Sequence, residues 1–397
     1  MEIRGDCLKR SFKLQARPLW HTPPMRFETK AIHAGMRVDS ETGAVAPPLH
    51  LSTTFERDDE GATPRGFGYV RDGNPTQARL EEALAAIDSA AAALAFASGM
   101  AAGSSLLQAL PAGSHILLPD DSYYGFRALA AEYFPQWGLS FDLVAMESAQ
   151  AVGAALEKKC SALWLETPSN PLMKVVDISA VSEMAHRAGA LVVVDGTFAT
   201  PALQRPLELG ADIVLHSTTK YLGGHTDVQG GSLAFRERNA LLEKVERTRL
   251  LIGAVASPFN SWLVLRGIRT LAARMRVHSE NAGAVATFLA GHPEVEAVYY
   301  PGLPAHPGHE VAARQMSGFG GMLSILVKGG RADALRVASR TRLFIRATSL
   351  GGVESLIEHR ASSEGPSSET PQNLLRMSVG LEHSEDLVAD LNEALRV

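Results

Sequence analysis

The sequence predicts an α/β protein with a mostly parallel central sheet, followed by a smaller C-terminal α+β domain. Short apolar runs alternate with amphipathic helical stretches through the first part of the chain. This alternation is typical of parallel strands covered by helices on both faces. The unusual polar residues follow the ends of these runs, and in such an architecture ligands bind beyond the carboxyl ends of the strands.

The 397-residue chain is long enough for two domains. We place a large domain at residues 61–256 and a small one at 257–397, preceded by an N-terminal arm at 25–60. Residues 1–24 lack the apolar core of a secretory signal. We expect them to be a disordered leader, or an over-long gene start with Met25 as the true beginning; a transit peptide is a further alternative.

Charge and cysteine content indicate a cytoplasmic enzyme that acts on small molecules. The net charge is −5 and no basic block occurs, so nothing favours nucleic acid or an anionic membrane as a partner. No run approaches the roughly 18 apolar residues of a membrane helix. The two cysteines, Cys7 and Cys160, lie far apart in the sequence, and neither has a second cysteine or a histidine at the spacing of a metal site. Both facts argue against a disulfide framework and a metal site.

The elements are expected in the following order. The stretch 27–57 shows little periodicity, so we expect an extended arm rather than a packed helix, of the kind that reaches a neighbouring subunit. Apolar residues at helical spacing predict a first helix over 76–87. Strands are then expected at 92–97, 115–119, 162–166, 191–195 and 211–215, with helices at 99–110, 126–134 and 178–188. Residues 240–290 are expected to be largely helical, followed by strands at 298–300 and 321–327, a polar loop at 362–371 and a closing helix at 386–395.

Lys220 is the first candidate catalytic residue. It follows a buried apolar run and has the hydroxyls of Ser217 and Thr219 beside it in the sequence. A lysine that adds to a carbonyl group needs a lowered pKa and a fixed position, which partial burial can supply. We interpret Lys220 as a covalent catalytic lysine, with a solvated lysine at the end of a strand as the alternative.

Asp195 ends another apolar run, where a carboxylate is costly unless something binds it. The protonated pyridine nitrogen of pyridoxal 5′-phosphate (PLP) would be such a partner, and a Schiff-base lysine with an acidic partner to the ring is the recurrent PLP-binding scheme. The alternative is a helix N-cap. The predicted cofactor is therefore PLP.

Other residues at the ends of strands complete the predicted cofactor site. Gly99 and Met100 begin a helix, where free N–H groups favour a phosphate. Tyr123 could lie on the face of the ring, and Asn170 could reach its phenolic oxygen. An aromatic residue is more often part of a core. The position of Tyr123 just after a strand is what favours a contact with the cofactor.

These residues together resemble the trans-sulfuration family of PLP enzymes, also called the Cys/Met-metabolism family, of the aspartate-aminotransferase fold type. The resemblance extends from about Phe27 to the C-terminus. It rests on these segments: Ala31–Gly35, Tyr69–Thr76, Ser98–Met100, Glu166–Pro171, Val194–Pro201, Ser217–Gly224 and Ser349–Leu356.

The resemblance implies a role for each matching residue. Lys220 would hold the cofactor as a Schiff base and shuttle protons, Asp195 would bind the pyridinium, and Tyr123 would stack on the ring and help to deprotonate the incoming amine. Arg376 would clamp the substrate α-carboxylate, with Ser349 close by. The phosphate ligands would be Gly99, Met100, Ser217 and Thr219, with Tyr69 and Arg71 of the neighbouring subunit. The family also implies a homotetramer, a dimer of dimers with shared active sites.

The sequence departs from the family pattern at several positions. Gly196 replaces the asparagine of relatives. The usual Gly-Gly-Thr after Tyr123 is Tyr124-Gly125-Phe126, so Tyr124 is an alternative stacking residue. The usual Pro-Ala-Ser-Met-Thr-His after His359 begins here with Arg360, which puts specificity in doubt.

The expected reaction lies at the γ-carbon of a sulfur amino acid, of the cystathionine γ-lyase or γ-synthase type. Glu354 is a candidate to meet the distal ammonium of cystathionine, with an exposed glutamate as the alternative. Arg127 is a weaker candidate for a distal carboxylate. Methionine γ-lyase, cystathionine β-lyase and O-acetylhomoserine sulfhydrylase are alternative activities, although the loop cysteine of methionine γ-lyases is absent.

Three other classes of protein fit the sequence less well. Ser217 and Lys220 also match the Ser-x-x-Lys motif of acyl-serine hydrolases, but the accompanying Lys-Thr-Gly is absent. A nicotinamide-binding Rossmann enzyme would carry an early Gly-x-Gly-x-x-Gly turn, which is also absent. A non-catalytic protein of the PLP fold would be expected to have lost Lys220, Asp195 or Arg376.

Overall fold

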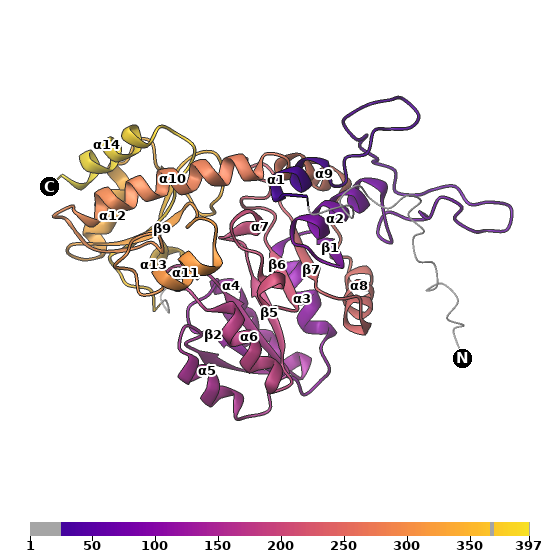
Figure 1. Ribbon diagram of the computed structural model, residues 1–397, viewed down its shortest axis with the longest axis horizontal. Coiled ribbons are helices and arrows are strands. Elements are labelled where there is room, and N and C mark those ends of the chain that lie inside the picture. The colour runs from indigo at the N-terminus through magenta and orange to yellow at the C-terminus, as the bar shows by residue number, and fades with distance from the viewer. Residues whose placement is uncertain (1–24, 366–368, 397) are drawn as a thin grey trace.

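The computed structural model describes residues 25–365 and 369–396 as two β-sheets with their covering helices (Figure 1). The predicted leader at 1–24 lies outside the described residues. The larger sheet and its helices form the lower part of the view, and the smaller sheet lies at the upper left. The long helix α10 (Leu271–Ala290) runs from one to the other.

The larger sheet has seven strands in the order β1-β7-β6-β5-β4-β2-β3. Its strands are β1 (Ala92–Phe96), β2 (His115–Pro119), β3 (Ser140–Val144), β4 (Ala162–Glu166), β5 (Leu191–Asp195), β6 (Ile213–His216) and β7 (Gly231–Phe235). Only β7 pairs antiparallel with its neighbours, β1 and β6. The carboxyl ends of the other six strands therefore meet along one edge of the sheet.

Helices cover both faces of this sheet because its buried strands are apolar on both sides. Trp164 of β4 belongs to one core, with Phe126, whose ring centroid lies 4.7 Å away. Leu163 and Leu165 of the same strand belong to the opposite core. The first face is covered by α3 (Gly99–Ala109), α4 (Tyr124–Tyr133) and α8 (Ala240–Ile252). The second is covered by α2 (Pro75–Ile87), α5 (Ala149–Leu156), α6 (Ile178–Arg187) and α9 (Pro258–Ile268).

The smaller sheet has five strands in the order β10-β11-β12-β9-β8. They are β8 (Val295–Tyr299), β9 (Met322–Val327), β10 (Ile345–Arg346), β11 (Leu356–His359) and β12 (Leu374–Ser378). The second half of α10 shares a separate apolar core with this sheet and with α12 (Arg331–Arg340) and α14 (Ser384–Leu395). The short helices are α1 (Phe27–His33), η2 (Phe134–Trp137), α7 (Thr200–Leu203), η3 (Pro206–Leu209), α11 (His309–Gln315) and α13 (Arg360–Glu364).

The predicted domain boundary near Ser257 stays a prediction. Val264 and Leu265 of α9 pack in the core of the larger sheet, as does Met275 in the first half of α10. Ala282 and Val285, further along α10, belong to the core of the smaller sheet. A division drawn by core membership therefore falls within α10.

The N-terminal arm and one loop differ from the sequence prediction. The arm begins with α1, a packed helix, because Ala31 is buried against the core of the larger sheet. Beyond α1 the arm forms long loops that project from the body at the right of Figure 1. The predicted loop at 362–371 is helical at its start, where α13 ends at the buried Glu364.

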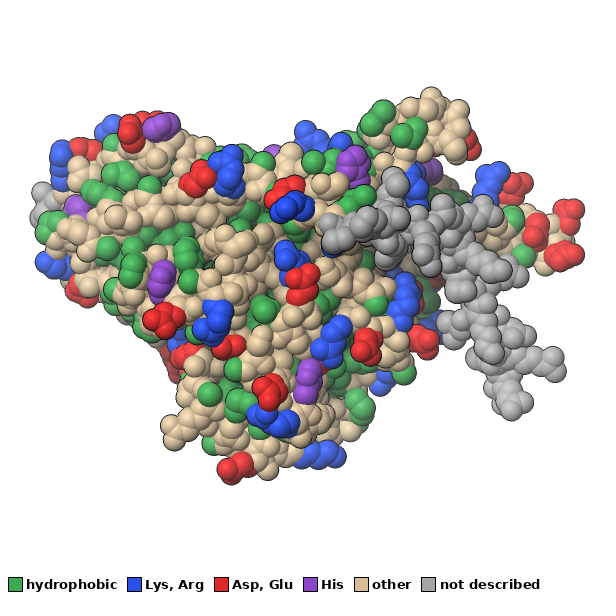
Figure 2. Space-filling model, viewed as in Figure 1, with side chains coloured by type: hydrophobic (Ala, Val, Ile, Leu, Met, Phe, Trp, Pro, Cys, Tyr) green, Lys and Arg blue, Asp and Glu red, His purple; other side chains and the backbone are tan. Residues whose placement is uncertain are grey.

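Positive and negative side chains are interspersed over the face seen in Figure 2, without a large patch of one sign. Among the described residues, no helix combines the length and apolar character required to cross a membrane. Cys160 is buried with a free thiol; Cys7 lies outside the described residues.

Candidate active site

Most of the predicted site residues lie along the edge where the parallel strands end. Lys220 lies in the turn after β6, and its backbone N–H donates to Ser217 O at 3.1 Å. A loop of the smaller domain packs directly on this turn. The packing is so close at Gly351 that a Cβ added there would lie only 2.6 Å from Tyr221 N. Both domains therefore fix the position of Lys220.

The Lys220 amine is held by Ser349 of that loop. Its Nζ donates to Ser349 Oγ at 2.8 Å. Burial, and next the nearby Arg376 guanidinium, lower the pKa of Lys220 from its ordinary value to about 8. The Ser-x-x-Lys interpretation required a contact with Ser217, but the bond to Ser349 directs the amine elsewhere.

Asp195 lies at the end of β5 beside Glu166 at the end of β4, with which it is paired in register. Asp195 Oδ1 accepts the backbone N–H of Thr197 at 3.0 Å, and Glu166 Oε2 accepts that of Tyr123 at 2.8 Å. Burial raises the pKa of both carboxyl groups, and the Asp195 charge raises that of Glu166 further. Because both the side chain and the backbone of Thr197 lower the pKa of Asp195, whereas the Asp195 charge raises that of Glu166, we assign the negative charge of the pair to Asp195.

A buried ion pair lies behind Asp195. His216 Nε2 and Asp88 Oδ1 are 3.0 Å apart, and both side chains are almost completely buried. Although burial opposes it, the Asp88 carboxylate raises the pKa of His216. The His216 ring packs against Gly196, where a Cβ would lie 2.9 Å from His216 Cε1. The ring thus occupies space that a side chain at position 196 would need.

The first turn of α3 provides the predicted anion site. Ser98 caps this helix by accepting Ala101 N–H at 3.0 Å. Ser217 lies against its start, because a Cβ at Gly99 would be 3.1 Å from Ser217 Cβ. Thr219 Oγ1 donates to Gly230 O at 3.2 Å. A Cβ at the adjacent Gly231 would lie 2.6 Å from Gly99 N, so the Thr219 segment also packs on the start of α3. The first N–H groups of a helix, which have no partner within the helix, therefore lie near two hydroxyl-bearing residues, as an anion requires.

Tyr123 lies beside this turn. A Cβ at Gly125 would be 2.5 Å from Tyr123 Cε1 and 3.1 Å from Met100 Sδ, so both side chains meet at that glycine. Tyr123 is 42% exposed, so part of its surface is open to a ligand. Tyr124 begins α4 and is similarly exposed. The position of Tyr123 near Met100, at the predicted phosphate site, favours Tyr123 as the stacking residue.

Arg376 connects the two domains at the site. It lies on β12 opposite Glu358 of β11, to which its Nη2 donates. The same Nη2 donates to Ser349 O at 2.9 Å, and Nη1 donates to Asn170 Oδ1 of the large domain at 3.1 Å. Burial lowers the pKa of Arg376 to about 10, which leaves the guanidinium charged at neutral pH.

The remaining predicted residues have local contacts. Tyr69 is 45% exposed, and the Arg71 guanidinium lies 5.5 Å from the centroid of its ring. Glu354 accepts a hydrogen bond from Thr226 Oγ1, close to the Lys220 turn in sequence. Arg127 Nη1 donates to Asp120 O at 3.3 Å.

Sequence reasoning missed the residues that support these groups. Glu166, the His216–Asp88 pair and Glu358 all contact or flank predicted site residues. Glu166 could have been found as a second acid at a strand end. Glu358 and Asp88 gave no local signal, since their partners are distant in the sequence.

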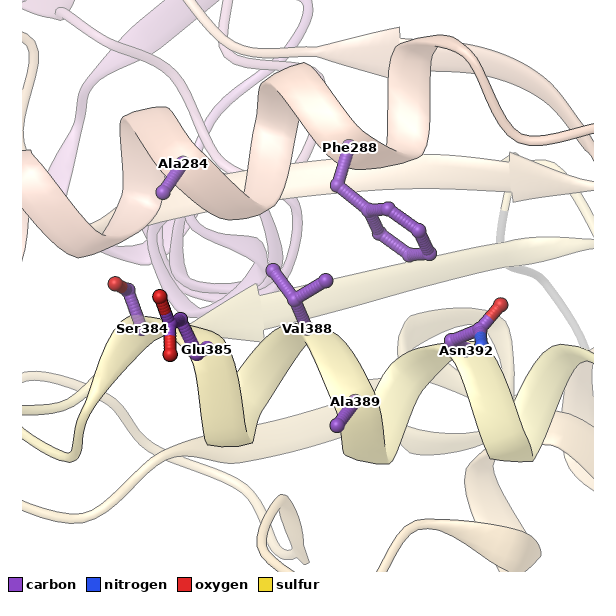
Figure 3. A pocket seen from close by; sticks show the side chains of 7 residues that line it. All are labelled: Ala284, Phe288, Ser384, Glu385, Val388, Ala389 and Asn392. Atoms are coloured by element: carbon purple, nitrogen blue, oxygen red, sulfur yellow. The ribbon is translucent and has the colours of Figure 1, made fainter.

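No group of acidic, histidine or cysteine side chains suited to a metal occurs among the described residues. A separate groove of about 330 Å³ lies between α10 and α14 (Figure 3). Phe288 and Val388 point toward each other across it, and it contains none of the predicted site residues.

Comparison with known proteins identifies the family. The model of the Cys/Met metabolism PLP-dependent enzymes matches residues 28–396. The cystathionine gamma-synthase of Mycobacterium tuberculosis is 51% identical over 373 residues, which cover 92% of this chain and 96% of the relative. The cystathionine gamma-lyase of Dictyostelium discoideum is 44% identical over 375 residues, covering 92% and 97%.

A solved structure agrees with this assignment. The cystathionine gamma synthase of Xanthomonas oryzae pv. oryzae, in complex with cystathionine, superposes with a TM-score of 0.89 at 42% identity, covering 94% of this chain and 98% of that one. The predicted fold type is therefore confirmed. The chain belongs to the family of Cys/Met metabolism PLP-dependent enzymes.

Proposed function

We propose that this enzyme acts at the γ-carbon of a sulfur amino acid, as cystathionine γ-synthases and γ-lyases do. One observation carries the proposal: Ser349 joins the Lys220 amine to the Arg376 guanidinium, accepting from Nζ on its hydroxyl and from Nη2 on its carbonyl. A substrate whose carboxylate binds Arg376 would therefore have its α-carbon next to Lys220 Nζ.

The residues present fit PLP. Asp195 would bind the pyridine nitrogen, because a buried carboxylate with a raised pKa is stabilised by a cationic partner. Gly99, Met100, Ser217 and Thr219 would hold the phosphate at the start of α3. Asn170 would face the phenolic oxygen and Tyr123 the ring. When bound, PLP supplies an electron sink for negative charge that develops on the substrate.

Lys220 would move the protons of the reaction. A pKa of about 8 leaves a fraction of the amine neutral near physiological pH, so free Nζ would act as a base toward the bound substrate. It would take the proton from the α-carbon, pass it on, take a second proton from the β-carbon and give that proton to the γ-substituent as this departs. Tyr123 would assist deprotonation of the incoming amine, and Ser349 Oγ would hold Nζ in place.

The carboxylate of Glu354 is the proposed contact for the distal ammonium of the substrate. It lies in the loop between Gly352 and Ser355, which continues from the Ser349 turn, and Thr226 holds its orientation. A carboxylate facing an ammonium forms a charge-assisted hydrogen bond. This contact would favour cystathionine over amino acids that lack a second amine.

We further propose a homotetramer, a dimer of dimers in which the arm completes a neighbouring active site. Val45 and Leu51 of the arm are 71% and 64% exposed, a cost that a subunit interface would remove. Tyr69 and Arg71 follow the arm in the sequence and would reach the phosphate of the neighbour. The free, buried thiol of Cys160 agrees with a cytoplasmic location.

The test is the absorbance spectrum of the purified protein followed by product analysis. A visible band that borohydride abolishes supports the lysine-bound cofactor, whereas a colourless protein that takes up no PLP contradicts the proposal. Cystathionine formation from cysteine and an O-acylhomoserine indicates a synthase. Cysteine and 2-oxobutyrate from cystathionine indicate a γ-lyase, and homocysteine with pyruvate would show β-lyase chemistry instead.

A further inference from the structure

Four charged side chains form a buried row behind the carboxylate clamp. Arg376 donates to Glu358, Arg360 Nη1 donates to Glu358 Oε1 and Oε2 at 3.2 and 3.3 Å, and Arg360 Nη2 donates to Glu364 Oε1 at 3.0 Å. The side chains of Arg376 and Arg360 are 4% and 7% exposed, and those of Glu358 and Glu364 are 7% and 2% exposed. We call these four side chains the charge row.

The charge row has a fixed direction. Its signs alternate, with the cation Arg376 at the substrate end and the anion Glu364 at the far end. Glu364 Oε2 accepts the hydroxyl of Thr370 at 2.8 Å, and Glu358 Oε1 accepts that of Ser363 at 2.7 Å. Each carboxylate therefore accepts a hydroxyl in addition to its arginine partner.

Glu358 is shared between the guanidinium groups of Arg376 and Arg360, and this sharing affects how Arg376 can bind a substrate carboxylate. With Arg376 as its only cationic partner, Glu358 would neutralise the group that has to bind the substrate carboxylate. Arg360 draws part of the Glu358 charge toward itself, and Glu364 balances Arg360. Arg360 occupies the position where the family pattern has a proline, so this device belongs to the altered segment of this chain.

We propose that Arg360 is a positioning residue for the substrate α-carboxylate: by sharing Glu358, it leaves the Arg376 guanidinium available to an amino-acid ligand. The inference rests on the role of Arg376 in the proposed function. It predicts that Arg360 affects ligands that carry a carboxylate and spares amines that lack one.

The test compares glycine with methylamine, which differ only in the carboxylate, by titrating each into the PLP-loaded protein and following the absorbance of the cofactor. Wild type should bind glycine more tightly than methylamine. Arg360→Met should reduce that preference about tenfold, the scale of one charge-assisted hydrogen bond, with methylamine affinity unchanged. Glu364→Gln should keep or increase the preference, because Arg360 then loses one of the two carboxylate partners that it has among the described residues and keeps Glu358.

A double variant separates this role from folding. Arg360→Met alone leaves Glu364 buried without its arginine, whereas Arg360→Met with Glu364→Gln removes both charges. The double variant should regain thermal stability and still show the reduced preference for glycine. A full wild-type preference in the double variant would overturn the inference.

Arg376→Met distinguishes the carboxylate-binding role of Arg376 from the positioning role of Arg360. If it abolishes the preference and Arg360→Met does not reduce it, the charge row is merely structural and the proposed clamp stands. If wild type itself shows no preference for glycine, the assigned role of Arg376 fails, and the inference fails with it.

Discussion

Replacing Lys220 with methionine is expected to stabilise the cofactor-free protein at neutral pH. Burial holds the pKa of Lys220 at about 8, below its ordinary value of 10.5. Each tenfold change in acidity corresponds to about 1.4 kcal/mol, so keeping this amine protonated in the folded protein costs about 3 kcal/mol. Loss of the hydrogen bond to Ser349 offsets about 1 kcal/mol, which leaves a net gain of about 2 kcal/mol for Lys220→Met.

The sign of the pH dependence follows from the two pKa values. Between about pH 8 and 10.5 the unfolded chain binds more protons at Lys220 than the folded chain, so wild-type stability rises with pH in this window. Below pH 8 the amine is charged in both states and its full cost is present. The advantage of Lys220→Met should therefore be largest near pH 7 and shrink toward pH 10.

Urea unfolding of both proteins at pH 7 and pH 10 provides the measurement. PLP must be removed from both, because a ligand of the folded state would stabilise the two proteins to different extents. Lys174→Met is the matched control: although burial opposes it, hydrogen bonds with Glu147 and Asp120 raise the pKa of Lys174, so its loss should destabilise the protein at pH 7. Equal or lower stability of Lys220→Met at pH 7 would refute the reasoning.

Three further changes test other parts of the site. Asp195→Asn should weaken retention of PLP during dialysis by at least about tenfold, because the ring nitrogen loses its charged partner; unchanged retention would exclude that contact. Gly196→Ala should destabilise the protein by about 1–3 kcal/mol in urea unfolding, since its Cβ would lie 2.9 Å from His216 Cε1, whereas Gly283→Ala, with open space around it, should not. Co-expressed Arg71→Ala and Lys220→Met chains should form hybrids with activity that neither parent shows; failure to recover any activity would argue against shared active sites.

The central strands could be predicted because burial on both faces makes them continuous apolar runs. The strands at 115–119, 162–166 and 191–195 have the expected bounds. In contrast, β7 (Gly231–Phe235) was missed because glycine and serine begin it, and β10 has only two residues. The helix α1 was missed because it buries little apolar surface.

The candidate site could be predicted only where a residue is unusual in its own segment. Lys220 and Asp195 are charges at the ends of apolar runs, and that local contrast indicated them. Glu358 has no such contrast, and it gains its role only because the antiparallel register places it opposite Arg376. The pairing of Asp88 with His216 likewise depends on the tertiary structure, since 128 residues separate them.

The distribution of charge at the site determines how a bound amino acid is oriented. The negative charge of the Glu166–Asp195 pair lies at the end of the larger sheet. Burial raises the pKa of both acids there, so the pair carries one negative charge rather than two. The positive charges of Arg376 and Lys220 lie on the other side, at the contact with the smaller domain. A substrate carboxylate is attracted to the second group and repelled by the first, whereas the pyridine nitrogen of PLP behaves in the opposite way. In the proposed function, the α-carbon would therefore be held between them at Lys220 Nζ, and the rest of the substrate side chain would extend toward Glu354, in the loop that continues from Ser349.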